Sequence, residues 1–82
     1  MKYMNKENIV NYIRKHIAFV TALYEENIET DKYLSKYEID FFEWQEIIMG
    51  ISEKYDILPE YIEKAKTINE LTDIILKNIN KK

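Results

Sequence analysis

Cysteine is absent from this chain of 82 residues, and glycine, proline and histidine occur once each. Without cysteine there is no disulfide, no thiolate metal site and no cysteine nucleophile. So few turn residues disfavour an all-β fold and favour helices joined by polar loops. No apolar run is long enough to span a membrane, and residues 1–15 lack the apolar core of a signal peptide, so a cytoplasmic location is expected.

The charges are unevenly distributed around a net charge of −3. Residues 25–63 contain twelve acidic and three basic residues, whereas residues 1–24 and 64–82 each carry a net charge of +3. An acidic middle repels nucleic acid and can steer a basic protein partner, or it can simply be a well-solvated surface. The basic residues form no stripe with interleaved aromatics, so neither nucleic acid nor a membrane is an expected partner.

The apolar spacing predicts an all-α single domain over residues 1–82, with three main helices and one short helix. The first helix is expected from about Lys6 to Leu23, with Asn5 as its N-cap. Its inward stripe is predicted to contain Ile9, Ile13, Ile17 and Val20, broadened by Val10 and Phe19. A long loop then covers residues 24–38, with a short helical turn near residues 31–35.

The second helix is predicted to start after Asp40, because Asp40 and Glu43 have the spacing of a capping box. It should end near Tyr55, since Pro59 disfavours helix at Leu58. A short helix is expected over residues 59–64, and a last helix begins at Thr67, capped by Thr67 or Asn69. The inward residues of the last helix are predicted to be Ile68, Leu71, Ile74, Ile75 and Ile79, and residues 78–82 are expected to fray.

Few residues offer chemistry. His16 has no cysteine or carboxylate placed to form a triad or a metal site, so it is interpreted as structural. Gly50 is predicted to lie within a helix and not in a phosphate-binding loop. In a helix, glycine can let another helix or a partner approach closely. Glu25 and Glu26 lack the apolar surroundings that raise a carboxyl pKa. We therefore predict no enzyme activity, no catalytic residue and no metal site.

Seven segments matter by their order and spacing: Asp40, Phe42, Glu46, Ile47–Met49, Tyr55–Asp56, Leu58–Glu60 and Thr67–Leu71. Together they resemble the motifs of the acyl carrier protein family. In that family a Leu-Gly-x-Asp-Ser-Leu motif opens the second helix, an Ile-Pro-Asp/Glu segment follows it, and Thr-Val-x-x-Leu starts the last helix. The resemblance implies a carrier-like bundle whose last helix runs roughly parallel to the second.

The carrier's modified serine is replaced by Phe41, and the glycine of the motif by Glu38. Phenylalanine has no hydroxyl to receive phosphopantetheine, so no cofactor is expected. Modification at Ser35 or Ser52 is the alternative, in which case the chain is a genuine carrier of an unusual pathway. A third possibility is a small helical interaction module, such as an antitoxin or adaptor, unrelated to carriers.

The aromatic residues Phe41, Phe42 and Trp44 allow three interpretations. All three could pack in the core, with Phe42 facing inward. Phe41 could instead be an exposed docking anchor. Phe41 or Trp44 could also fold back into the space that a carrier offers an acyl chain.

The resemblance implies that the second helix meets the basic patch of a partner, an enzyme or assembly of fatty-acid or polyketide biosynthesis. We expect a monomer that binds this partner through Asp40, Phe41, Glu43, Glu46, Met49 and Glu53.

Overall fold

The computed structural model describes residues 5–80, which contain four α-helices, two short 3-10 helices and no strand. The α-helices are α1 (Lys6–Thr21), α2 (Phe41–Tyr55), α3 (Pro59–Ile62) and α4 (Ile68–Asn80). The long loop between α1 and α2 carries the 3-10 helices η1 (Glu25–Asn27) and η2 (Leu34–Tyr37). The predicted all-α class, with three main helices, one short helix and a long first loop, is confirmed.

The helix ends follow from local hydrogen bonds. Asn5 caps α1 by accepting the backbone N–H of Asn8 at 2.8 Å, as predicted. The helix ends at Thr21, before Leu23, because Ala22 takes a left-handed conformation with φ 65°. Thr67 caps α4 by accepting the backbone N–H of Glu70 at 3.1 Å. Helix α4 continues to Asn80, residues 81–82 lie outside the described part of the chain, and the expected fraying of residues 78–82 stays a prediction.

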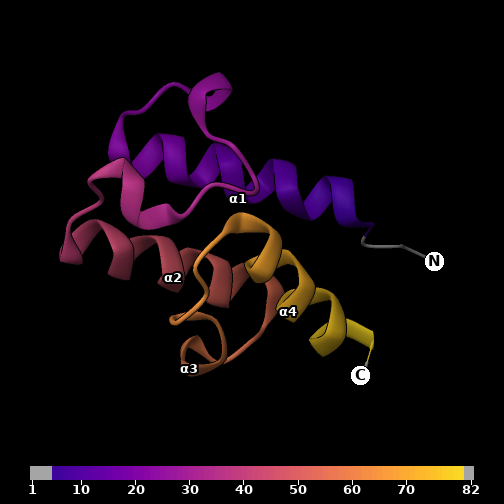
Figure 1. Cartoon of the computed structure of the whole chain (residues 1–82). Helices are drawn as coiled ribbons and strands as arrows, with labels where there is room; N and C mark the ends of the chain where they lie inside the picture. The colour runs from indigo at the N-terminus through magenta and orange to yellow at the C-terminus, as the bar shows by residue number, and fades with distance from the viewer. Residues whose placement is uncertain (1–4, 81–82) are drawn as a thin grey trace.

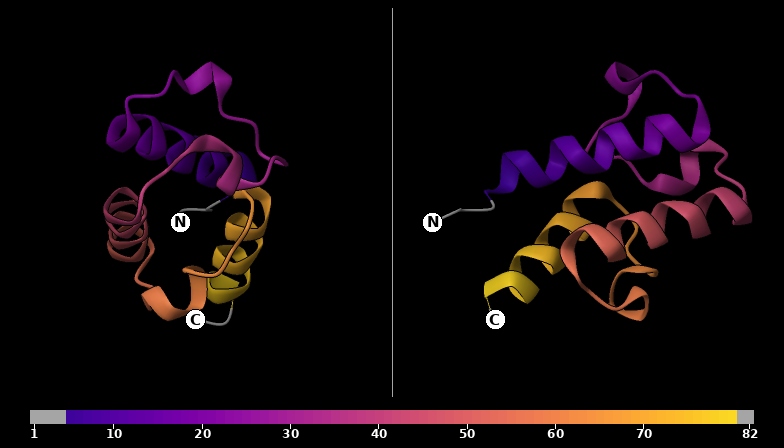
Figure 2. Two further views of the ribbon diagram at one scale, coloured as in Figure 1. Left: turned by 60° about the vertical axis from the view of Figure 1, so that its left-hand side comes forward. Right: turned by 180° about the vertical axis from the view of Figure 1, so that it is seen from behind.

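Helix α1 packs against both α2 and α4, and the short α3 contacts both of these helices from the other side (Figure 1). Helices α2 and α4 run in the same sense, opposite to α1, which the views from two further directions also show (Figure 2). Two backbone hydrogen bonds join the long loop to α4 and to the residue that precedes its N-cap. Leu34 N–H donates to the Lys66 carbonyl at 2.8 Å, and Asn69 N–H donates to the Thr30 carbonyl at 3.0 Å.

The core between these helices is made almost entirely of isoleucine. Of the fourteen buried apolar residues between residues 5 and 80, eleven are isoleucine, two are leucine and one is Tyr55. The predicted inward residues Ile9, Ile13 and Ile17 of α1 are fully buried, and so are Ile68, Leu71 and Ile75 of α4. Val20, Ile74 and Ile79 pack at the margin of this core. No phenylalanine is buried in it.

Gly50 leaves room on α2 for the imidazole ring of His16 from α1. A Cβ atom at this position would lie 2.1 Å from Nε2 of His16, far inside van der Waals contact. His16 stacks on Tyr12 with ring centroids 5.7 Å apart, and its Nε2 lies 3.4 Å from the Glu46 carbonyl oxygen. The single histidine is therefore part of the helix packing, as its structural interpretation predicted.

Ionisation of Tyr55 is expected to lower the stability of the fold at alkaline pH. Burial, with the neighbouring Tyr12 adding to it, raises the pKa of Tyr55 to about 12. The unfolded chain releases this proton near pH 10, as tyrosine does in peptides (about 10), while the folded chain retains it. Stability should therefore fall as the pH rises from about 10 to 12, by no more than about 3 kcal/mol from this group.

Replacing Tyr55 with phenylalanine should remove that loss, because no ionisable group remains at the position. Urea unfolding of both proteins at several pH values across this window measures the difference directly. The wild-type curve should fall more steeply with pH than the Tyr55→Phe curve, and equal slopes would contradict the assignment. Burial, and secondarily the Glu53 carboxylate, also raises the pKa of Tyr12, so a smaller alkaline loss should persist in the variant.

Candidate functional site

The first turn of α2 is fixed by the predicted capping box. The Asp40 carboxylate accepts the backbone N–H of Glu43 at 2.8 Å, and the Glu43 carboxylate accepts the backbone N–H of Asp40 at 3.0 Å. Asp40 is exposed and Glu43 is half-buried. Both side chains, which are predicted as partner contacts, therefore stabilise the start of the helix, so substituting either one is expected to perturb folding.

Replacing Asp40 with alanine should lower the free energy of unfolding by about 0.5–2 kcal/mol, because the N–H of Glu43 loses its acceptor. Replacing it with serine should retain most of the stability, since a serine hydroxyl also accepts at an N-cap. Urea denaturation followed by circular dichroism compares the two. An Asp40→Ser variant as unstable as Asp40→Ala would contradict the assigned role of the cap.

The structure places both phenylalanines of this turn on the surface. Phe41 is 68% exposed and Phe42 is 80% exposed, and their rings meet edge-on with centroids 5.7 Å apart. The core interpretation of Phe41 and Phe42 is therefore wrong. So is the expected burial of Phe42, because the inward face of α2 is taken by Ile47, Ile48, Ile51 and Tyr55. Phe19 is also 83% exposed, so it does not broaden the buried stripe of α1 as predicted.

The outward face of α2 alternates apolar and acidic side chains. Its members are spaced four, three and four residues apart, so they form one stripe along the helix: Phe42, Glu46, Met49 and Glu53. All four are exposed, and Met49 retains 51% of its accessible area. The predicted partner residues Glu46, Met49 and Glu53 thus lie together on one surface. Phe42, for which burial in the core was one interpretation of the sequence, completes this surface.

Trp44 points in a different direction from this stripe. Its ring is half-buried, and the indole N–H donates to the carbonyl of Glu63 at 3.2 Å. It lines a cleft of about 380 Å³ together with Tyr33, Leu34, Ser35, Ile39, Glu63, Ala65 and Lys66. Of the three aromatic residues, Trp44 is therefore the one that folds back between helices, whereas Phe41 remains outside.

The two serines differ in their surroundings. The Ser52 hydroxyl is half-buried and donates to the carbonyl of Ile57, where it helps to end α2. Ser35 is exposed in η2 and lies beside the cleft at Trp44. Ser35 is therefore the more accessible of the two hydroxyls for modification.

Glu38 adopts a backbone conformation that favours glycine. Its φ is 52° and its ψ is 41°, in the left-handed region, just before the cap of α2. A side chain in this region costs about 1–2 kcal/mol, and glycine avoids most of that cost. Glycine at this position would therefore relieve the strain of the turn.

Replacing Glu38 with glycine should accordingly leave the free energy of unfolding unchanged or raise it by up to about 1 kcal/mol. Glycine in an ordinary loop position is instead destabilising, because it enlarges the conformational freedom of the unfolded chain. Thermal and urea unfolding of Glu38→Gly against wild type test this. A loss above about 1 kcal/mol would show that the left-handed turn is not formed.

Within residues 5–80 no three His, Asp or Glu side chains are grouped in a way that could hold a metal ion. In the same range, no helix has the length and apolar character needed to cross a bilayer. No family model, curated protein or solved structure matches the chain. The resemblance to acyl carrier proteins therefore stays a prediction from the motif residues.

Proposed function

We propose that this chain is an arm-free protein of the acyl-carrier type that works by binding a protein partner through α2. The observation that carries the proposal is the placement of phenylalanine. All three phenylalanines of the chain lie on the surface, at 68–83% exposure, while the core is built from isoleucine. Large exposed apolar side chains that the fold does not use are typical of docking surfaces.

The chemistry of this surface indicates the kind of partner. Glu46 and Glu53 alternate with Phe42 and Met49 along the outward stripe of α2. A partner that covers the stripe must bury apolar contacts and neutralise carboxylates. It therefore presents lysine or arginine around an apolar socket. Such a basic surface is what carrier-recognising enzymes offer to the second helix of a carrier, so a biosynthetic enzyme or assembly is the proposed partner.

Two features of the fold support the carrier resemblance. Helix α4 runs in the same sense as α2, as the resemblance implied (Figure 1). The left-handed backbone at Glu38 coincides with the glycine of the carrier motif. Phe41 follows the capping Asp40, at the position of the modified serine, and has no hydroxyl to carry a prosthetic arm.

The alternative function, a genuine carrier modified at another serine, has one accessible candidate. Ser35 is exposed, whereas the hydroxyl of Ser52 is bonded to the Ile57 carbonyl. Ser35 lies in η2, outside the first turn of α2. A transferase would therefore have to accept an attachment site in a different local frame from that of a carrier.

Charge reversal on α2 tests the proposal. The chain is immobilised and exposed to a lysate of cells that encode it, and the retained proteins are identified and purified. Each is then titrated with the wild-type chain and with the Glu46→Lys/Glu53→Lys variant. The variant should bind at least about tenfold more weakly, because it opposes basic groups with basic groups. Glu26→Lys/Asp73→Lys, which changes the net charge equally at exposed positions on η1 and α4, is the matched control. If every retained protein binds the α2 variant as tightly as it binds the wild-type chain, the proposal is wrong.

A further inference from the structure

The surface on α2 continues onto α1, as the register of the two helices shows. Tyr12 donates from its hydroxyl to the Gly50 carbonyl at 3.4 Å, and His16 lies at the same distance from the Glu46 carbonyl. A step of four residues forward on α1 thus matches a step of four residues back on α2. One further turn along α1 brings Phe19 to the level of residues 42–43.

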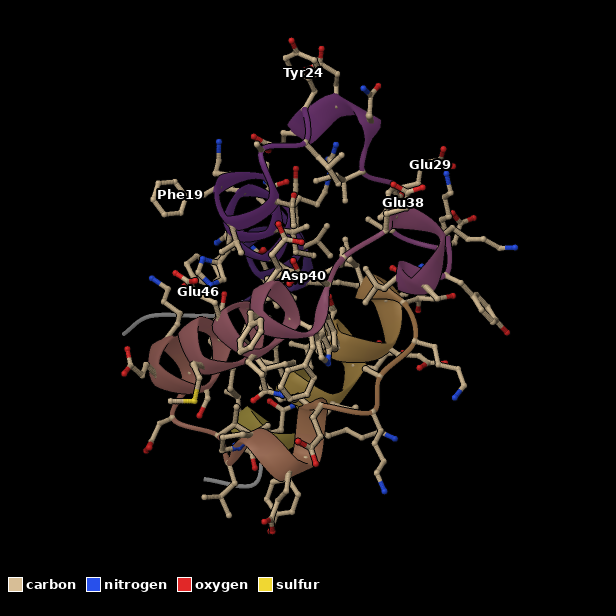
Figure 3. The ribbon with its side chains drawn as sticks, turned by 90° about the vertical axis from the view of Figure 1, so that its left-hand side faces the viewer. Phe19, Tyr24, Glu29, Glu38, Asp40 and Glu46 are labelled. Carbon is tan, nitrogen blue, oxygen red and sulfur yellow. The ribbon has the colours of Figure 1, made fainter. Side chains whose placement is uncertain are left out.

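Phe19 lies on the side of α1 that faces α2. Tyr12, His16 and Phe19 are spaced by four and three residues, so they share one stripe, and the first two contact α2. By this register Phe19 lies at the level where α2 begins, and its side chain is 83% exposed. Figure 3 shows Phe19 and Glu46 on the same side of the molecule, with Tyr24 directed away at the top.

We call the surface between α1 and α2, bordered by Tyr12, His16 and Phe19 on α1 and by Phe42, Glu46 and Glu53 on α2, the seam. It has a phenyl ring on each helix, with carboxylates beside the ring on α2. Phe19 stands on α1 and Phe42 on α2, and Glu46 lies one turn beyond Phe42 on the same stripe. The nearest basic side chain on this part of α1, Lys15, is paired with Glu25 at 3.6 Å. Lys54 of α2 also lies between the helices, over the Tyr12 ring at 5.1 Å, near the end of α2 that is far from Phe42. The part of the surface around Phe19, Phe42 and Glu46 thus presents apolar and negatively charged groups together.

We propose that the occupant of this seam is a basic amphipathic helix of the partner, packed against α1 and α2 together. Its apolar side chains contact Phe19 and Phe42, and its lysine or arginine side chains face Glu46 and Glu53. This inference rests on the proposed function and names the form of the partner.

Three physical arguments select a helix. Residues 5–80 contain no strand, so they offer no sheet edge to an extended peptide. A seam between two antiparallel helices accepts the side-chain ridges of a third helix. Along α2, carboxylates alternate with apolar side chains. An amphipathic helix can place arginine against the carboxylates and leucine against the apolar side chains.

The probe is a synthetic peptide of about 18 residues, long enough to form a helix, with leucine at helical spacing and arginine on the flanking positions. Its counterpart has glutamate in place of arginine. Two-dimensional NMR of the isotopically labelled chain follows each titration. The arginine peptide should shift the amides around Phe19 and along α2, and the glutamate peptide should bind at least about tenfold more weakly.

Phe19→Ala should weaken binding of the arginine peptide at least about tenfold, because an aromatic anchor is lost. Tyr24→Ala is the matched control, since Tyr24 is 72% exposed and points away from α2, and it should change the affinity less than about twofold. The NMR spectra also verify that both variants are folded. Both residues are exposed, so neither substitution should unfold the chain.

Three outcomes overturn the inference: no binding of the arginine peptide, equal binding of the glutamate peptide, or unchanged affinity in Phe19→Ala. These outcomes are separable from failure of the proposed function, which is judged by the identified partner and the α2 charge reversal. If Phe19→Ala leaves the affinity unchanged while Glu46→Lys/Glu53→Lys still weakens binding of the natural partner, the binding surface is confined to α2 and the proposed function stands.

Discussion

Replacing Ile62 with alanine is expected to lower the free energy of unfolding by about 2–5 kcal/mol. Ile62 has no exposed area and is the only buried residue of α3, the short helix that contacts both α2 and α4. Truncation removes buried methyl groups and leaves a cavity, which α3 can close only by moving against both neighbours. A domain of 82 residues has a total stability of roughly 4–12 kcal/mol, so this single change removes a large share of it.

Tyr61 provides the matched control for this experiment. It is adjacent in the same helix and larger, but it is 55% exposed. Tyr61→Ala should therefore change the free energy of unfolding by less than about 0.5–1 kcal/mol. Urea denaturation followed by circular dichroism measures both variants. If Tyr61→Ala proved the more destabilising of the two, the assignment of Ile62 as the anchor of α3 would be wrong.

The double substitution Phe41→Ala/Phe42→Ala should weaken binding of the natural partner by at least about thirtyfold, or about 2 kcal/mol. Both rings are exposed in the free chain, and the proposed partner would bury them. The same variant should unfold within about 1 kcal/mol of wild type, because little buried area is lost. Isothermal titration calorimetry with the purified partner gives the first quantity, and urea unfolding gives the second.

The decisive pattern is the separation of the two effects. A loss of binding with stability retained is what a docking surface predicts. A loss of stability as large as that of Ile62→Ala would mean that the phenylalanines serve the fold. Tyr24→Ala, an equally exposed aromatic substitution on the far side of α1, should change neither quantity.

Much of the fold could be predicted because the relevant signals are local. Asp40 and Glu43 define the start of α2 by their spacing, and both capping hydrogen bonds form. Pro59 marks the start of the short α3, and Thr67 marks the start of α4. Each of these residues acts on backbone groups within about four positions of itself, so no knowledge of tertiary structure is required.

The burial of the phenylalanines was predicted less well, for two different reasons. Phe42 could have been placed from sequence, because it shares a stripe with Glu46, Met49 and Glu53 and not with the isoleucines of α2. Its size and apolar character suggested the core instead. Phe19 could not have been placed, because it does lie on the side of α1 that faces α2. Its exposure depends on the tertiary register that puts it where α2 begins.

That Trp44 folds back between the helices was one of the three interpretations of the sequence, but the residues that line the cleft around it could not be predicted. The cleft is formed by η2, the first turns of α2 and the segment between α3 and α4, which are far apart in the chain. The hydrogen bond from the Trp44 indole to the Glu63 carbonyl likewise joins residues nineteen positions apart. Contacts of this kind leave no periodic pattern that a sequence could reveal.

The central claim is that this chain works without a prosthetic arm, and intact-mass spectrometry tests it most directly. The purified chain is weighed before and after incubation with coenzyme A and a broad-specificity phosphopantetheinyl transferase, beside a carrier protein as positive control. We predict an unchanged mass while the control gains one phosphopantetheine group. A gain of one group by this chain, lost again in Ser35→Ala, would contradict the account and make the protein a carrier with a displaced attachment site.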